Sequence, residues 1–388
     1  MSASHRSSFR YLIPRLVLLT GTLLIMEGAA RVWLSWAASS EQRVKYALYE
    51  DLNPGEARVV PHPYLCYANT PGYRRGALSH NREGFRGPDF SLQKPSGVFR
   101  IVALGGSTTY TEGVSDNREI FTAHLERMLR ERGFGRVEVI NGGVPGYNTW
   151  ETLVYLCFRV LELDPDLLII YHGTNDVHCR FVNPEAYRAD NRGRRKYWEA
   201  PRVSSLQRHC TLWRIARRFR GASHMGLEPF TNAPQYYGPY HSVDDPDAFF
   251  GDLLDRNPAH FSRDNLRNIL AIAREHEVDV LLTSWAWTDA IPGDYAGFSF
   301  YQRGFREMNA LTEKLAEEKG APFFDFAAQM PRDLRYWRDG RHVNEEGSLL
   351  MAWLFADYLA GGMLLEAARG PAAAGASRET GETGSEDE

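Results

Sequence analysis

Apolar segments alternate with amphipathic segments from residue 99 to residue 360, and this alternation most constrains the fold. Short apolar runs between turn signals are typical of buried strands, whereas apolar residues three and four apart are typical of helices packed by one face. Strands that alternate with such helices predict βα units around a mostly parallel sheet. The predicted strands are 99–104, 137–141, 167–172, 278–284 and 322–326. The predicted helices are 117–132, 148–162, 262–276, 301–319 and 344–360.

The N-terminal segment, residues 1–38, is first basic and then apolar. Its early cations have no acidic residue among them, and an almost continuous apolar run covers 16–26. The stretch 12–38 is long enough to cross a bilayer if Glu27 and Arg31 pair one helical turn apart or lie near the interface. We therefore expect a membrane anchor. The basic residues that precede the apolar run are Arg6, Arg10 and Arg15.

The side of the membrane follows from those cations. Positive residues before a span favour a cytoplasmic N-terminus, so the remaining chain is expected outside the cytoplasm, in a periplasmic or extracellular position. A cleaved signal peptide is the alternative, because Gly28-Ala29-Ala30 fits a small-x-small cleavage site. Both interpretations export the domain.

Three further segments complete the predicted organisation. Residues 39–98 are rich in proline and are expected to form a juxtamembrane arm laid on the main domain. The domain spans 99–365, with an insertion at about 178–261 that is too long for a simple connection. Residues 366–388 lack periodicity and are predicted to be disordered.

The insertion contains an arginine-rich stretch with one apolar helix face. This face could belong to a cap that shapes the substrate site, to a basic surface near anionic lipid or polysaccharide, or to a solvated helix packed on the sheet. Its apolar residues are Leu206, Trp213, Ile215 and Phe219.

Charge and cysteine content exclude some classes of function. The 388 residues carry a net charge of -4 and no recognisable nucleic-acid motif, so no nucleic-acid partner is expected. The four cysteines have no C-x-x-C spacing, which disfavours a zinc site and favours free thiols. In an exported domain, Cys179 and Cys210 are one pair that could be oxidised. The other two are Cys66 and Cys157.

Ser107 follows the first predicted strand on the tight turn Gly105-Gly106. A serine on such a turn after a central strand is where nucleophilic hydrolases hold their attacking oxygen. The alternative is that Ser107 only caps the following helix.

An aspartate and a histidine lie three residues apart, just before the last predicted helix. In this Asp339-x-x-His342 pair, the carboxylate can accept a hydrogen bond from one ring nitrogen while the other faces Ser107. Open α/β sheets bind ligands beyond the carboxyl ends of their strands, where this loop is expected.

Two glycine-containing loops follow the second and third predicted strands. They read Asn141-Gly-Gly-Val-Pro-Gly146 and His172-Gly-Thr-Asn-Asp176. A loop glycine lets a backbone N–H approach a ligand, and Asn175 offers a neutral donor suited to an oxyanion hole. Taken singly, each loop is also explained by turn formation, and His172 and Asp176 are expected to make hydrogen bonds within their loop.

In this order, the four segments resemble the four blocks of the SGNH hydrolase superfamily, also called GDSL esterases, over residues 99–360. The resemblance implies an α/β fold: a flavodoxin-like three-layer α/β/α sandwich with a mostly parallel five-stranded sheet. It further implies Ser107 as nucleophile, His342 as base and Asp339 as its orienting partner. The oxyanion donors would be the Ser107 and Gly146 backbone N–H groups and the Asn175 side chain.

One position departs from this pattern. The first block of the superfamily usually reads Gly-Asp-Ser, whereas this chain has Gly106 in place of the aspartate. The resemblance implies no metal or organic cofactor. The absence of a G-x-G-x-x-G motif after the first strand disfavours dinucleotide binding.

Together these features predict an exported, membrane-tethered serine esterase that works through an acyl-enzyme. Expected substrates are small acyl esters, including O-acyl groups on envelope carbohydrate or lipid. One alternative uses the same triad to transfer the acyl group to a polysaccharide hydroxyl. Another is a non-catalytic binding protein of the same fold.

Overall fold

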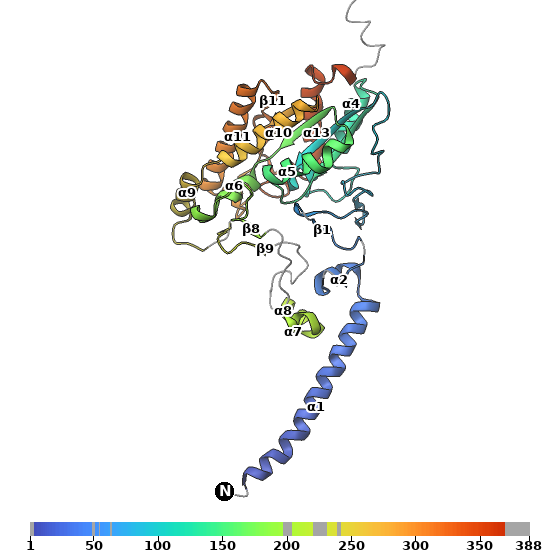
Figure 1. Cartoon of the computed structure of the whole chain (residues 1–388), viewed down its shortest axis with the longest axis vertical. Helices are drawn as coiled ribbons and strands as arrows, with labels where there is room; N and C mark the ends of the chain where they lie inside the picture. Colours follow the sequence, from blue (N-terminus) through green and yellow to red (C-terminus); the bar gives the residue numbers. More distant parts are fainter. Residues whose placement is uncertain are drawn as a thin grey trace, which may run out of the picture.

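The computed structural model describes residues 4–48, 51–53, 55–62, 64–196, 204–219, 231–238 and 242–368. Its centre is a five-stranded sheet with the spatial order β11-β10-β7-β5-β6, in which every pairing is parallel (Figure 1). Counted along the chain this order is 5-4-3-1-2, the flavodoxin-like arrangement, so the predicted fold class is confirmed. The strands are β5 (Phe99–Gly105), β6 (Val137–Gly143), β7 (Leu167–Tyr171), β10 (Asp279–Thr283) and β11 (Phe323–Phe324).

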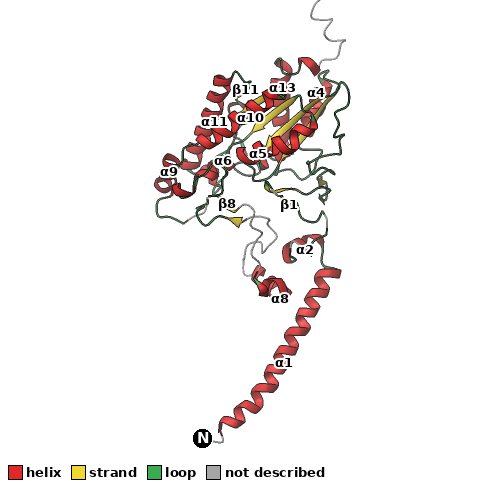
Figure 2. Ribbon diagram, in the orientation of Figure 1, coloured by secondary structure: helices red, strands yellow, loops and turns green. Residues whose placement is uncertain are grey.

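Both faces of the sheet are buried by helices, which gives three layers (Figure 2). Successive side chains of a strand point to opposite faces. In β5, Ile101 and Ala103 therefore join the cluster under α4 (Phe121–Glu131) and α13 (Glu345–Gly361). The alternate side chains Val102 and Leu104 join the cluster under α5 (Thr149–Tyr155) and α10 (His260–Glu275).

The predicted helices are present, with small shifts of their ends. The stretch predicted as helix 148–162 contains α5, a π-helical turn at Leu156–Val160 and a 3-10 turn at Leu161–Leu163. Helix α11 (Ser299–Lys319) packs against β10 and ends at Gly320, whose φ of +62° suits glycine. Short α12 (Phe326–Gln329) follows β11.

The arm of residues 39–98 lies on the loops that follow β5 and β6. Strands β1 (Val59–His62) and β2 (Cys66–Asn69) form an antiparallel hairpin, and β3 (Arg74–Arg75) pairs with β4 (Leu78–Ser79). The Tyr67 hydroxyl donates to the Pro145 carbonyl at 2.6 Å. The buried Arg86 guanidinium donates to three carbonyls of the loop after Ser107, those of Tyr110, Thr111 and Val114.

Helix α6 (Thr174–Arg180) directly follows β7 and leads into the inserted region. Within that region, β8 (Arg195–Lys196) pairs with β9 (Thr231–Asn232). The expected apolar helix is two helices, α7 (Ser205–His209) and α8 (Thr211–Phe219), which are separated at Cys210. Helix α9 (Pro246–Arg256) was not predicted.

The N-terminal helix α1 (Ser4–Val32) projects away from the domain (Figure 1). It continues as a π-helical turn, Trp33–Ala37, and is followed by α2 (Ser40–Tyr46). The 25 residues Ile13–Ala37 are long and apolar enough to cross a membrane, with mean hydropathy 1.5, and a signal sequence would pass the same test. The C-terminal tail forms a 3-10 turn at Glu366–Ala368, and its predicted disorder from 369 onward lies outside the described residues.

Candidate active site

Three polar side chains from opposite ends of the domain form a continuous hydrogen-bonded chain. Ser107 begins α3 (Ser107–Tyr110), directly after β5. Its Oγ lies 2.8 Å from Nε2 of His342, and Nδ1 of the same ring lies 2.8 Å from Oδ2 of Asp339. The structure thus brings together the hydroxyl, imidazole and carboxylate that the sequence singled out.

The loop that carries Asp339 and His342 is held by its own hydrogen bonds. The second carboxylate oxygen of Asp339 accepts from the backbone N–H groups of Arg341 and His342, each at 2.9 Å. Burial alone would raise the pKa of the Asp339 carboxyl, but the hydrogen bond and charge of His342, with a further contribution from Arg341, hold that pKa well below its usual range. Asp339 is therefore an ionised acceptor that fixes the orientation of the imidazole.

Two loops meet at Gly106, the residue before Ser107. A Cβ on Gly106 would lie 2.5 Å from Nδ2 of Asn175 and 3.0 Å from the carbonyl oxygen of Tyr147. Any side chain at this position would displace the Asn175 amide or a backbone carbonyl. The glycine that replaces the usual aspartate therefore makes room for a close approach of Asn175.

Gly146 occupies a backbone conformation that favours glycine, with φ +89°. Its carbonyl accepts a 2.5 Å hydrogen bond from Nη2 of Arg195, and Nη1 of Arg195 pairs with the fully buried Glu151 at 2.7 Å. Within the described part of the chain, no group accepts a hydrogen bond from the N–H of Gly146 or of Ser107. Both N–H groups are thus available as donors.

Asn175 is buried near the start of α6, and its side chain is fixed on both sides. Nδ2 donates to the Tyr147 carbonyl at 2.8 Å, and Oδ1 accepts from Nη2 of Arg194 at 3.4 Å. Nη1 of Arg194 also donates to the Asn175 backbone carbonyl at 3.0 Å. Arg194 and Arg195 therefore support the two loops that carry Asn175 and Gly146.

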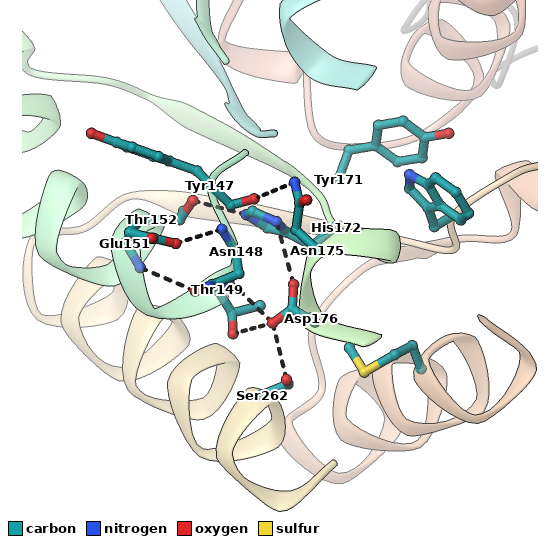
Figure 3. A network of polar contacts seen from close by, with 12 residues as sticks. Tyr147, Asn148, Thr149, Glu151, Thr152, Tyr171, His172, Asn175, Asp176 and Ser262 are labelled. Atoms are coloured by element: carbon teal, nitrogen blue, oxygen red, sulfur yellow. Dashed lines mark hydrogen bonds and ion pairs between the residues drawn. The ribbon is translucent and has the colours of Figure 1, made fainter. Parts of the chain in front are cut away.

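A separate polar network lies next to this site (Figure 3). Oδ1 of Asp176 accepts from the Thr149 hydroxyl at 2.7 Å and from the Ser262 hydroxyl at 2.9 Å. Nε2 of His172 is 2.8 Å from the Thr152 hydroxyl, while its Nδ1 is 3.7 Å from Oδ2 of Asp176. His172 and Asp176 are therefore parts of a buried network that joins the loop after β7 to α5 and α10.

Sequence reasoning missed Arg86, Arg194 and Arg195, which donate hydrogen bonds to the loops that carry the site residues. All three are nearly inaccessible to solvent. In the sequence, an arginine-rich stretch is most simply interpreted as a solvated surface, because charged residues are seldom fully buried unless paired. Glu151, the partner of Arg195, gave no signal either, because an acidic residue three positions after Asn148 is explained by the capping box at the start of α5.

Two cavities lie beside the arm and are not lined by Ser107 or His342. One of about 860 Å³ is bordered by α2 and reaches Tyr67 and Pro145. The other, of about 370 Å³, lies between the β1–β2 hairpin and the helix after β6. In the described part of the chain, no group of three or more His, Cys, Asp or Glu side chains is placed to hold a metal ion. All four cysteines are free thiols, so Cys179 and Cys210 are not joined.

Comparison with solved structures returns hydrolases at low similarity. The lipase/acylhydrolase from Enterococcus faecalis is 18% identical with a TM-score of 0.40, and the match covers 68% of this chain and 96% of that one. A GDSL-like lipase from Bacteroides thetaiotaomicron is 18% identical with a TM-score of 0.37, over 68% and 88% of the two chains. The acetyl xylan esterase AlAXEase is 14% identical with a TM-score of 0.40, over 67% and 100%. Likenesses this weak carry no argument about activity.

The family comparison is decisive. No curated protein matches the chain. The model of the GDSL-like lipase/acylhydrolase family, however, matches residues 103–350, which is more than half of the 388 residues. This range begins in β5 and ends in α13, so it contains the end of β5, the other four strands of the sheet and all three residues of the hydrogen-bonded chain. The chain therefore belongs to the GDSL-like lipase/acylhydrolase family of the SGNH hydrolase superfamily and is an ester-hydrolysing enzyme.

Proposed function

We propose that this enzyme is a membrane-anchored serine esterase that cleaves small acyl esters through Ser107, His342 and Asp339. The observation that supports the proposal is the unbroken chain of two 2.8 Å contacts from the Ser107 hydroxyl to the Asp339 carboxylate. Nucleophilic catalysis by serine needs this arrangement, because a hydroxyl is a weak nucleophile until a neighbouring base accepts its proton.

In the first half of the reaction, His342 takes the proton of Ser107 as the hydroxyl oxygen attacks the ester carbonyl carbon. The tetrahedral oxyanion is stabilised by the N–H groups of Ser107 and Gly146 and by the second N–H of the Asn175 amide. His342 then protonates the leaving alcohol, and Asp339 stabilises the imidazolium that forms between these two steps. Water, activated by His342, attacks the acyl-enzyme and releases the acid.

The location we propose is outside the cytoplasm, with the apolar N-terminal helix retained in the membrane. The support is the length and hydropathy of Ile13–Ala37 together with the three arginines that precede most of it, Arg6, Arg10 and Arg15. A domain held there would meet O-acyl groups on envelope carbohydrate or lipid, which are the substrates we propose.

A panel of p-nitrophenyl esters of graded acyl length tests the assignment of the nucleophile. Wild type is expected to hydrolyse the short esters and to be labelled by a fluorophosphonate, whereas Ser107→Ala should do neither. The control is Ser299→Ala, because Ser299 is an exposed serine that begins α11 and bonds Asp247. Equal activity in wild type and Ser107→Ala would overturn the proposal.

The same assay separates hydrolysis from acyl transfer. Sugars with free hydroxyl groups are added as acyl acceptors at increasing concentration, and free acid and acylated sugar are both quantified. Free acid as the main product supports an esterase. Acylated sugar as the main product would show that the triad serves an acyltransferase instead.

A further inference from the structure

We infer that the α7–α8 hairpin docks on the N-terminal helix through Glu27 and lies in the outer interface of the same bilayer. The described part of this hairpin, residues 204–219, belongs to the inserted region, more than 170 residues after α1 in the sequence. The inference rests on the membrane anchoring proposed above. Its tests measure contact and depth instead of hydrolysis, so the two proposals can fail separately.

The contact between the two helices is polar and specific. Glu27 accepts hydrogen bonds from the first two backbone N–H groups of α8, those of Thr211 at 2.8 Å and Leu212 at 2.9 Å. The Sγ of Cys210 lies 3.4 Å from the same carboxylate. Arg31 completes the arrangement, because it pairs with Glu27 at 2.7 Å and also donates to the His209 carbonyl.

This arrangement solves an energetic problem of the apolar span. Glu27 lies fourteen residues beyond Ile13, or about 21 Å along a helix. In a hydrocarbon layer about 30 Å thick that begins at Ile13, it therefore lies about 9 Å below the outer surface. A carboxylate at that depth is costly unless it is paired. The N-terminal N–H groups of α8 and the guanidinium of Arg31 supply its partners, and the positive end of the α8 dipole adds to the attraction.

An apolar contact fixes the same hairpin next to α2. Leu34, Tyr46 and Ala47 form a small buried cluster, against which Ile215 of α8 packs. The buried Arg214 donates through Nε to the Tyr46 carbonyl at 3.0 Å. Figure 1 shows α7 and α8 beside the end of α1 and below α2.

The remaining surface of the hairpin fits a lipid interface. Phe219 is 79% exposed, Leu206 is 53% exposed and Trp213 is 40% exposed, while Trp36 in the π-helical turn after α1 is 88% exposed. Residues 204–219 contain four arginines and no acidic residue. Aromatic and basic side chains on an amphipathic helix are typical of helices that lie in the interface, with their apolar face about 5–10 Å into the boundary between headgroups and acyl chains. Because α8 is bound to a membrane-spanning helix, the partner of its exposed surface is the bilayer that α1 crosses.

Cleavage after Ala30 would remove Glu27 and leave the start of α8 without its acceptor. The docking therefore favours a retained anchor over a cleaved signal, and cross-linking of the full-length protein in its membrane tests it. With Arg31→Cys and the native Cys210, which leave the Glu27 carboxylate in place, a short bismaleimide is expected to join the two positions, as read by mass spectrometry of the linked peptides. Ile25→Cys is the matched control, because residue 25 is 75% exposed and on another face of α1.

Equal cross-linking of both variants, or of neither, would overturn the docking, as would a mature chain that begins after Ala30. If Arg31→Cys does not accumulate, Glu27→Cys takes its place, one turn earlier on the same face.

Depth is measured separately, in full-length protein reconstituted into vesicles that carry a nitroxide on the lipid headgroup. A fluorophore is attached at Phe219→Cys, in a chain whose half-buried Cys157 and Cys210 are replaced by serine. The control is the same label at Met363→Cys, an exposed position just after α13. We expect quenching at 219 to exceed quenching at 363 by about threefold or more. Equal quenching at the two positions would overturn the interfacial placement.

Discussion

Two hydroxyl–imidazole–carboxylate chains lie within this domain, and they differ in access and geometry. The first joins Ser107, His342 and Asp339, with both contacts at 2.8 Å. The second joins Thr152, His172 and Asp176 (Figure 3), with a 2.8 Å contact to the hydroxyl but 3.7 Å between the imidazole and the carboxylate.

The comparison teaches that the residue types alone do not make a reactive site. Thr152, His172 and Asp176 are all buried, and Asp176 already accepts hydrogen bonds from Thr149 and Ser262. Ser107, in contrast, is only half-buried and lies at the switch point between β5 and β7, where open α/β sheets bind ligands. A substrate can reach the first chain, whereas the second is suited to hold loops in place.

The largest expected difference comes from replacing the two histidines. His342→Ala should lower kcat by about 10⁶-fold, because Ser107 loses its base. His172→Gln should keep kcat within about tenfold but lower the free energy of unfolding by about 1–3 kcal/mol, because buried hydrogen bonds are lost. Steady-state kinetics and urea unfolding separate the two effects. A similar loss of kcat in both variants would remove the distinction between the chains.

The next largest effect is expected at Asn175, which lies after β7 and directly before Asp176 of the second chain. Asn175→Ala should reduce kcat by about 10²–10³-fold with little change in KM, because the lost amide N–H acts mainly on the oxyanion. Asn183→Ala is the control, since Asn183 only caps the 3-10 turn Pro184–Ala186. A rise in KM at constant kcat would instead assign Asn175 to substrate binding.

A smaller effect is expected for Arg195, which links Glu151 of α5 to the Gly146 carbonyl. Arg195→Lys should keep the charge pair with Glu151 but lose the second hydrogen bond, to the Gly146 carbonyl, and kcat should fall about tenfold at constant KM. Arg192→Lys is the control, because Arg192 is exposed and pairs only with Asp190 among the described residues. An unchanged kcat in Arg195→Lys would show that the Gly146 loop holds its position without Arg195.

The smallest effect is a difference in pH dependence. Burial lowers the pKa of His172 below its usual 6.5, although Asp176 opposes the shift. The unfolded chain then binds a proton that the folded chain does not, so stability should fall as pH drops below about 6.5. His172→Gln should lose part of this slope between pH 7.5 and 5 in urea unfolding.

The contribution of Asp339 to stability should also fall with pH, but in a more acidic range than that of His172. Its lowered pKa gives a contribution to stability that is complete above the unfolded value of about 3.9 and is lost as pH falls through the lower folded value. The difference in stability between wild type and Asp339→Asn should therefore be constant from pH 7.5 to 5 and shrink only below about pH 4. A difference that shrinks near pH 6 would contradict this account.

Most of the sheet could be predicted from the sequence, because parallel strands buried on both faces are continuous apolar runs. Strand β5 was predicted as 99–104 and spans Phe99–Gly105, and β7 was predicted as 167–172 and spans Leu167–Tyr171. The positions of Ser107, Gly146 and Asn175 followed from the ends of β5, β6 and β7. The catalytic roles of these residues stay a prediction until the variants are measured.

The supports of the site could not be predicted in the same way. Arg194 and Arg195 are buried because they fit carbonyls and a carboxylate that lie far away in the sequence, and no periodicity encodes such a contact. The same holds for Glu27, whose partners in α8 are more than 180 residues away. Local patterns predict local structure, whereas a buried charge depends on which distant groups the fold brings to it.

The chain between β8 and α7 is short, and this limits where the enzyme can work. Lys196 ends β8 and Ser204 precedes α7, so seven residues lie between them, and the eight steps from one Cα atom to the next reach at most about 29 Å. With α7 in the membrane interface, this short connection keeps the reaction centre within a few nanometres of the bilayer. Turnover would then follow the surface density of acyl esters near that membrane, and dissolved polymer far from it would be poorly processed.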